Sequence, residues 1–172
     1  GQAFAQSPNA VAAPAFASDR LSVEVVGTGP DVILIPGFAS SREVWRAEAD
    51  RLKAVLLTAK AKEELDGEPS KARDHALSAH KLARDLVPAA VIAAKAYMRE
   101  DNVRKASSVL EQTWKLTPHP EIAAAYVRAR PGDSAVDRLK RAEKLEGYKP
   151  NNPEALFAVA EAALAATDFP KA

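Results

Sequence analysis

Residues 86–100 read LVPAAVIAAKAYMRE, and the order of residue types in this stretch returns further along the chain. Each copy has Leu-x-Pro, an Ala-rich run ending in Tyr, a polar turn, and then Ala and Leu. The second copy begins at Leu116 and has its turn at 131–133. Tyr97 and Tyr126 each precede the next Ala of the pattern by nine residues. Recurrence at roughly thirty residues is typical of stacked helical hairpins, so the stretch predicts an α-helical repeat array.

The composition agrees with closely packed helices and excludes several functional classes. Apolar residues make up 47% of the 172 residues and aromatic residues only 6%, and such an alanine-rich mixture favours helices over a sheet core. The formal net charge of +1 gives no sign of a nucleic-acid partner. The absence of cysteine excludes disulfides, thiolate metal ligands and a cysteine nucleophile. No apolar run approaches the length of about eighteen residues that predicts a membrane span.

Three segments with different patterns predict the domain organisation. Residues 1–18 are rich in Ala and Pro and are expected to form a disordered tail. Residues 19–53 are expected to hold two strands and then a helix over 42–53, which Ser41 can cap. Residues 54–172 are predicted to form the helical repeat domain. The fold class is therefore mainly all-α, with a short N-terminal β-hairpin-plus-helix segment.

The segment 19–53 has a β-rich pattern that is absent from the rest of the chain. Its alternating stretch 21–26 and its apolar run 32–35 predict strands, and the loop Pro36-Gly37-Phe38 follows the second one. This order resembles the start of an α/β-hydrolase, in which the backbone N–H of Phe38 would belong to the oxyanion hole. No G-x-S-x-G nucleophile elbow occurs in the chain. We therefore expect no catalytic residue and no enzyme activity.

Seven helices are predicted after residue 54, because runs of helical periodicity alternate with Pro and Gly breaks. Ala94 and Ala123 are assigned to positions where the two helices of a hairpin cross, with Ala106 and Ala135 on the paired helices, and we expect Ala94 and Ala123 to be buried. The turns are expected near residues 67, 101, 118, 132 and 150. The helices are expected at 55–65, 70–86, 88–101, 103–116, 121–130, 134–147 and 153–167.

The repeat region resembles a known family of helical repeats. Pro88, Pro118 and Pro150 recur at intervals of roughly thirty residues, which is a tetratricopeptide-like spacing, although the W-x-x-L-G start of that motif is absent. LVPAA at 86–90 and TWKLTPHP at 113–120 resemble the C-terminal domain of HemY-type proteins. So does RPGDS at 130–134, together with the DRLKRAE that follows it. The resemblance implies a bacterial protein linked to haem biosynthesis and held at the inner membrane by regions absent from this chain.

The two resemblances meet near residues 53–55, after only one strand pair and one helix of the hydrolase pattern. Because domain boundaries usually fall between complete folds, this junction predicts a fusion. The alternative is that residues 19–53 are a short native cap on the repeats. In either case the apolar run 32–35 lacks a sheet, so we expect residues 19–53 to pack on the first helix pair or to drive homo-oligomer formation.

The predicted binding surface is the concave face of the repeats. Its cations could clamp an acidic peptide or a terminal carboxylate of a protein partner, and the alternative is a solvated helix face without a ligand. His75 and His80 are five residues apart and do not share a helix face, so we expect no metal site. We also expect no cofactor. The residues assigned to the surface are Lys95, Met98, Arg99, Ala124 and Arg128.

The pattern thus favours a non-catalytic protein–protein interaction scaffold of bacterial envelope or haem-pathway type. Two alternatives remain open at the level of sequence. One is an incomplete α/β-hydrolase fragment that lacks its nucleophile, and the other is a purely structural oligomerising array.

Overall fold

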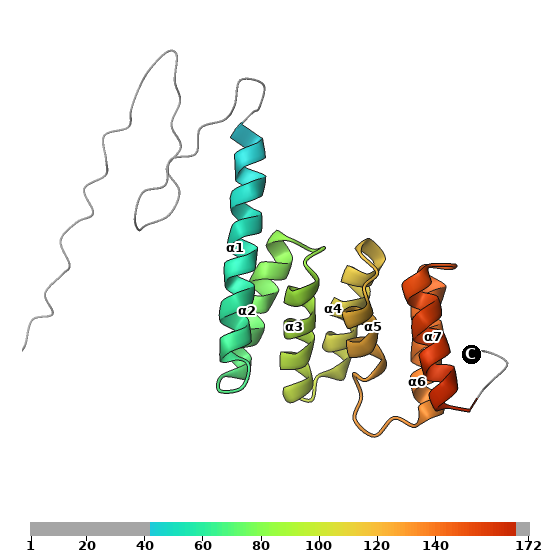
Figure 1. Ribbon diagram of the computed structural model, residues 1–172. Helices are drawn as coiled ribbons and strands as arrows, with labels where there is room; N and C mark the ends of the chain where they lie inside the picture. The colour runs from blue at the N-terminus through green and yellow to red at the C-terminus, as the bar shows by residue number, and fades with distance from the viewer. Residues whose placement is uncertain (1–41, 168–172) are drawn as a thin grey trace, which may run out of the picture. The chain divides into compact units, whose positions relative to one another are not determined.

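A computed structural model of the protein describes residues 42–167, and these form helices but no strand (Figure 1). The prediction of a mainly helical chain is confirmed for this range. The predicted tail, both predicted strands and the Pro36–Phe38 loop lie outside the described residues. The helices are α1 (Arg42–Glu64), α2 (Pro69–Leu82), α3 (Val87–Arg99), α4 (Val103–Leu116), α5 (Pro120–Val127), α6 (Ala135–Tyr148) and α7 (Pro153–Ala165).

Helix α1 runs without interruption through residues 53–55, where the sequence predicts a junction between two segments. The stretch RLKAVLL at 51–57 contains no Gly or Pro, so nothing in it ends a helix. The expected helices over 42–53 and 55–65 are therefore one element. Its first turns belong to the hydrolase-like pattern and its last turns to the repeat pattern.

Pro residues and polar caps set most helix starts. Pro is the first residue of α2, α5 and α7 and the second of α3, where its missing N–H removes no intrahelical bond. Ser134 caps α6 in a reciprocal box, because it accepts from the Asp137 amide while the Asp137 carboxylate accepts from the Ser134 amide. Between α5 and α6, Gly132 takes a φ of +85°, which glycine adopts without strain.

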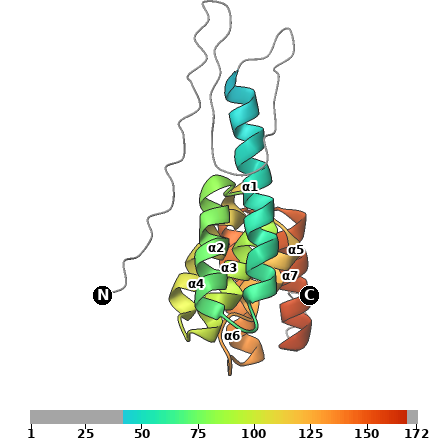
Figure 2. The ribbon, with the colours of Figure 1, turned by 90° about the vertical axis from the view of Figure 1, so that its left-hand side faces the viewer.

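The described helices pack in two rows. Consecutive helices run in alternating directions, and the odd-numbered helices α1, α3, α5 and α7 lie beside one another in front of α2, α4 and α6 (Figure 1; Figure 2). Each odd helix contacts the next odd helix, and every contacting pair is separated by at most one other helix. This pattern of contacts between near neighbours is the one expected of a repeat array.

The described part of the chain has a regular structural period. The odd helices α3, α5 and α7 begin at Val87, Pro120 and Pro153. Each start lies 33 residues after the previous one, which is also the separation between Arg128 and Glu161. Burial recurs with the same interval, as it would if each repeat placed the same position at the same interface. Three sets of residues with this spacing are buried, namely Ala89, Ile122 and Ala155, then Ala96, Ala129 and Ala162, and finally Ala76, Val109 and Ala142.

The core lies between the two rows, and its polar atoms connect successive even-numbered helices. The buried Trp114 of α4 donates its indole N–H to the carbonyl oxygen of Leu145 in α6 at 3.0 Å. The buried His80 of α2 lies 2.9 Å from the Thr113 hydroxyl of α4, and that hydroxyl donates to the Arg84 carbonyl oxygen. These bonds satisfy groups that would otherwise be costly to bury.

Ala94, Ala123 and Ala106 are buried, as their assigned roles require. Ala135 differs, because it is only half-buried and is the first residue of α6. The reason is that the sequence pattern aligns Tyr97 with Tyr126. Fewer residues separate these two tyrosines in the sequence than separate the starts of α3 and α5. The tyrosine alignment matches the ends of the two helices but not their starts, since α5 has 8 residues and α3 has 13.

We predict that Ala94→Leu destabilises the fold. Ala94 has no exposed surface and lies in the core between α3 and its neighbours, so a larger side chain must push the backbones apart. We expect a loss of about 1–3 kcal/mol in the free energy of unfolding, measured by chemical denaturation. Ala124→Leu is the matched control, because Ala124 lies on the exposed side of α5. Equal stability of the two variants would contradict the assigned packing.

Candidate binding surfaces

The five residues predicted to bind a partner all lie on odd-numbered helices or at the end of one. Lys95 and Arg99 are exposed on α3, Ala124 is exposed on α5, and the exposed Arg128 directly follows α5. Met98 is half-buried and packs against the core. The structure therefore brings four of the five to the surface of the odd-numbered row.

Two of the cations on this surface are tied to neighbouring helices. The guanidinium of Arg99 donates to the Leu65 carbonyl oxygen and pairs with Asp66, both just after α1. Arg128 lies 3.5 Å from the Glu161 carboxylate of α7, and both side chains are exposed. Lys95 forms no hydrogen bond or ion pair with a described residue. Exposed pairs of this kind contribute little stability and can exchange partners.

The structural period places the cations in a row across the odd-numbered helices. Lys62, Lys95, Arg128 and Glu161 are successive members of one set with that spacing, on or at the end of α1, α3, α5 and α7. All four are exposed. We call the first three the cation row. Lys62 is absent from the sequence-based site, and the spacing of helix starts is the signal that would have found it.

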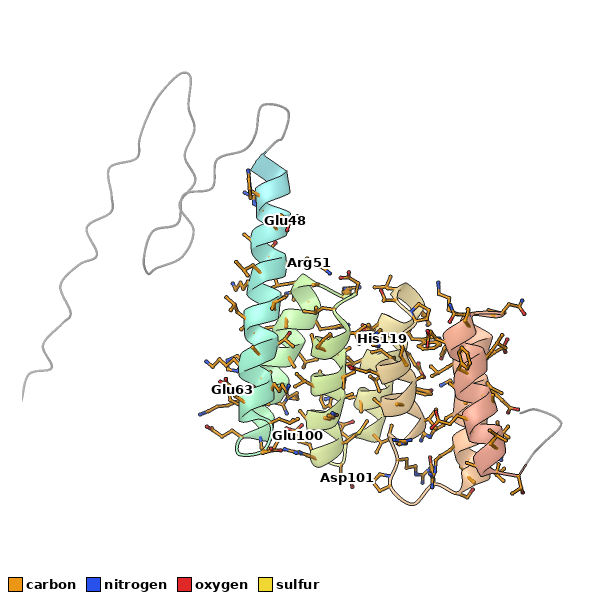
Figure 3. The ribbon with its side chains drawn as sticks, viewed as in Figure 1. Glu48, Arg51, Glu63, Glu100, Asp101 and His119 are labelled. Atoms are coloured by element: carbon orange, nitrogen blue, oxygen red, sulfur yellow. The ribbon has the colours of Figure 1, made fainter. Side chains whose placement is uncertain are left out.

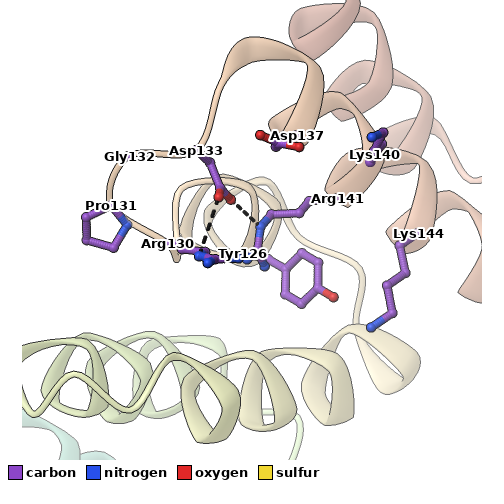
Figure 4. A pocket seen from close by; sticks show the side chains of 9 residues that line it. All are labelled: Tyr126, Arg130, Pro131, Gly132, Asp133, Asp137, Lys140, Arg141 and Lys144. Carbon is purple, nitrogen blue, oxygen red and sulfur yellow. Dashed lines mark hydrogen bonds and ion pairs between the residues drawn. The ribbon is translucent and has the colours of Figure 1, made fainter.

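A second surface lies on α4, α6 and the turn that joins α5 to α6. Helix α5 ends at Val127, and Pro131 and Gly132 keep the chain non-helical until α6 begins. The space beyond the short helix is an open pocket of about 540 Å³ (Figure 4). A neighbouring pocket of about 490 Å³ is lined by residues of α4. We call the two together the basic groove, because both are lined by Tyr126, Arg130, Arg141 and Lys144.

A hydrogen-bond network forms the wall of the basic groove. The hydroxyl of the buried Tyr126 donates to Glu111 Oε1 at 2.6 Å, and Lys144 Nζ donates to the same oxygen at 2.8 Å. Burial alone would raise the pKa of Glu111, but the bonds from Lys144 and Tyr126 outweigh it and hold this pKa below its usual value. Burial and the bond to Glu111 raise the pKa of Tyr126 to about 12. The network joins α4, α5 and α6.

Asp133 pairs with two arginines at the other end of the basic groove. Its carboxylate accepts from Arg141 Nε at 2.7 Å and lies 3.8 Å from Arg130 Nε (Figure 4). Arg141 and Lys144 also lie over the Tyr126 ring, at 5.8 and 5.9 Å from its centre. Three cations from two segments of chain therefore line this groove, two of them paired with Asp133 and one with Glu111.

The comparisons with known proteins connect neither surface with a known activity. No protein-family model matches the chain, and neither the curated proteins nor the solved structures include a match.

The remaining polar clusters have structural contacts of their own. His75 Nδ1 lies 2.6 Å from the Glu64 carboxylate. Arg51 of α1 reaches toward the turn between α2 and α3, where it pairs with Asp85 at 3.1 Å (Figure 3). Within residues 42–167, no group of three or more His, Cys, Asp or Glu side chains is placed to hold a metal ion. No helix in that range is long and apolar enough to cross a membrane.

We predict that Glu111 makes stability depend on acid pH. Because its folded-state pKa is lowered, its contribution is complete above the unfolded value of about 4.3 and is lost as the pH falls through the lower folded value. Glu111→Gln should lower the free energy of unfolding near neutral pH by about 1–3 kcal/mol. It should also flatten the loss of stability in acid.

Urea denaturation across the acid range measures both effects. Glu63→Gln is the control, because Glu63 is exposed on α1 and forms no hydrogen bond or ion pair with a described residue. A Glu111→Gln profile parallel to that of the parent protein would refute the assigned role.

Proposed function

We propose that this protein is a non-catalytic protein–protein interaction scaffold with a tetratricopeptide-like arrangement of helical hairpins. The regular recurrence of helix starts and of buried positions supports the arrangement, because its interval is close to the period of about 34 residues in tetratricopeptide units. The near-neighbour contacts of the two rows support it as well. In such arrays successive repeats present equivalent side chains along a continuous surface, which suits an extended ligand.

The observation that carries the proposal is the cation row of Lys62, Lys95 and Arg128. Packed helices lie about 8–10 Å apart. An extended segment in the polyproline II conformation has three residues per turn and advances about 3.1 Å per residue, so every third side chain lies on one face. One acidic side chain at every third position of a bound segment would therefore meet one cation on each helix. Arg128 can exchange Glu161 for such a ligand, since that pair is exposed. The partner is thus a protein with an extended acidic segment.

The biological setting of this partner rests on sequence resemblance. The HemY-like residues include Thr113 and Trp114, which bond between repeats, and the Arg130–Ser134 turn beside the basic groove. We place the partner in a bacterial envelope or haem-pathway assembly on that resemblance.

Peptide titration tests the cation row. We expect a peptide with glutamate at every third position to bind more tightly than a peptide of the same composition with adjacent glutamates. Lys95→Gln and Arg128→Gln should each weaken binding about two- to fivefold, as expected for exposed ion pairs. Lys81→Gln on α2 is the control, because it removes the same charge from an exposed position on the other row. Equal weakening by all three variants would indicate only a response to net charge and would exclude the proposed surface.

A structural role as an oligomerising array is the second candidate, and the exposed apolar side chains of the outermost described helices favour it. Leu156 and Phe157 of α7 are 50% and 72% exposed, whereas Ala90 and Val91, two periods earlier, are buried. Leu52 of α1 is 62% exposed, and it falls in the segment 19–53 predicted to drive association. The proposed occupant is a second copy of the chain, with α7 of one copy packing on α1 of the next.

Molar mass as a function of concentration tests this second candidate. Phe157→Ser should shift the protein toward the monomer, because it removes the largest exposed apolar side chain on α7. Leu116→Ser at the end of α4 is the matched control, since Leu116 is also exposed but lies between the outer helices. A parent protein that stays monomeric at high concentration would exclude this role.

A further inference from the structure

We propose that the basic groove binds a phosphate monoester group, at a site separate from the cation row. The residues that line the two pockets carry five cations and three carboxylates, a balance of 5 − 3 = +2. A phosphate monoester carries close to two negative charges above a pKa of about 6 and so balances this surplus, whereas a single carboxylate would leave one positive charge. The cations are Arg104, Arg130, Lys140, Arg141 and Lys144, and the carboxylates are Glu111, Asp133 and Asp137.

The carboxylates of the groove are already engaged. Glu111 accepts from Tyr126 and Lys144, and Asp133 accepts from Arg141. Asp137 accepts from both the amide and the hydroxyl of Ser134 at the start of α6. Because these acids hold fixed partners, several N–H donors of the groove have no hydrogen bond to them.

Three side chains that line the groove have donors without a hydrogen bond. The guanidinium of Arg130 lies 3.8 Å from the Asp133 carboxylate and makes no hydrogen bond to a described residue, so its five N–H donors are available. Arg141 uses its Nε for Asp133, which leaves both Nη groups, and Lys144 uses one of its three N–H bonds for Glu111. These three side chains line both pockets. Guanidinium and ammonium donors in one groove suit the several oxygens of a phosphate group.

The size of the groove indicates that the phosphate belongs to a larger molecule. The pocket beside the α5–α6 turn alone has a volume of about 540 Å³, which is within the range of sites that hold a small organic ligand rather than a bare ion. The hydroxyls of Ser107 and Ser108 and the exposed Arg104 continue the lining along α4. The same chemistry would accept a small phosphate ester or a phosphorylated side chain of a peptide.

Calorimetric titration of the full chain with phosphoserine, a phosphoserine peptide and the matching unphosphorylated peptide tests the site. We expect the two phosphorylated ligands to bind and the unphosphorylated peptide not to bind. Tighter binding of the peptide than of free phosphoserine identifies a phosphorylated protein segment as the source, and equal binding identifies a small ester. Binding should also be stronger near pH 7.5 than near pH 5.5, because the second phosphate proton is lost at a pKa of about 6.

Two variants at neighbouring positions separate this proposal from the scaffold proposal. Arg130→Gln should weaken phosphoserine-peptide binding about tenfold, the loss expected for one charge-assisted contact. Arg128→Gln should leave it unchanged, because Arg128 lies on the cation row and does not line either pocket. For the peptide with glutamate at every third position, we expect Arg128→Gln to weaken binding more than Arg130→Gln does. Both arginine side chains are 68% exposed, so both variants should fold, and a thermal melt checks this.

Three results would overturn the proposal. The first is the absence of phosphoserine-peptide binding at millimolar concentration. The second is equal weakening by Arg128→Gln and Arg130→Gln. The third is equal binding of the phosphorylated and unphosphorylated peptides, which would indicate recognition of some other feature.

Discussion

Alanine at the helix crossings is the constraint on which the rest of this structure depends. Helices of 8 to 14 residues, such as α2 to α7, are marginal in water by themselves, so they persist only through packing. Buried alanines such as Ala61, Ala76 and Ala94 let the backbones approach closely, and close approach multiplies dispersion contacts. The few large buried side chains, among them Trp114 and Tyr126, then lie between helices and also supply polar tips for hydrogen bonds.

This constraint explains how much of the fold the sequence can predict. Helical periodicity, interrupted by Pro and Gly, is a local signal, and it predicts seven helices and their turns within a few residues. The junction near residues 53–55 has no such local signal, since it rests on two resemblances, and α1 runs through it. The repeat interval is also a local signal, but it depends on which helix ends are aligned. The tyrosines give a shorter interval than the helix starts do, because α5 is short.

The binding surfaces are less predictable, because each collects side chains from several segments. Lys95, Arg99 and Arg128 are found from sequence because helical spacing places them on exposed faces. The same reasoning assigns Met98 to the exposed surface as well. Met98 is in fact half-buried, because its burial depends on the neighbouring helices rather than on its spacing in the sequence. The basic groove has donors from α4, from the α5–α6 turn and from α6. The early end of α5 leaves space beside these donors, and Pro131 with Gly132 marks that end in the sequence.

The shortening of α5 also determines where a ligand would have the largest effect on the fold. With 8 residues, α5 makes fewer contacts with α4 and α6 than the longer α2 makes with α1 and α3. The Tyr126–Glu111–Lys144 network and the Arg141–Asp133 pair partly replace the missing helix turn with polar contacts. Polar contacts of this kind have a strict geometry and respond to added charge. Because the described helices contact only near neighbours, an anion held by Arg130, Arg141 and Lys144 would act on this junction more than on the α1–α3 end. If the basic groove binds an anion as proposed, the α4–α6 junction is the place in the described chain where binding would affect folding most.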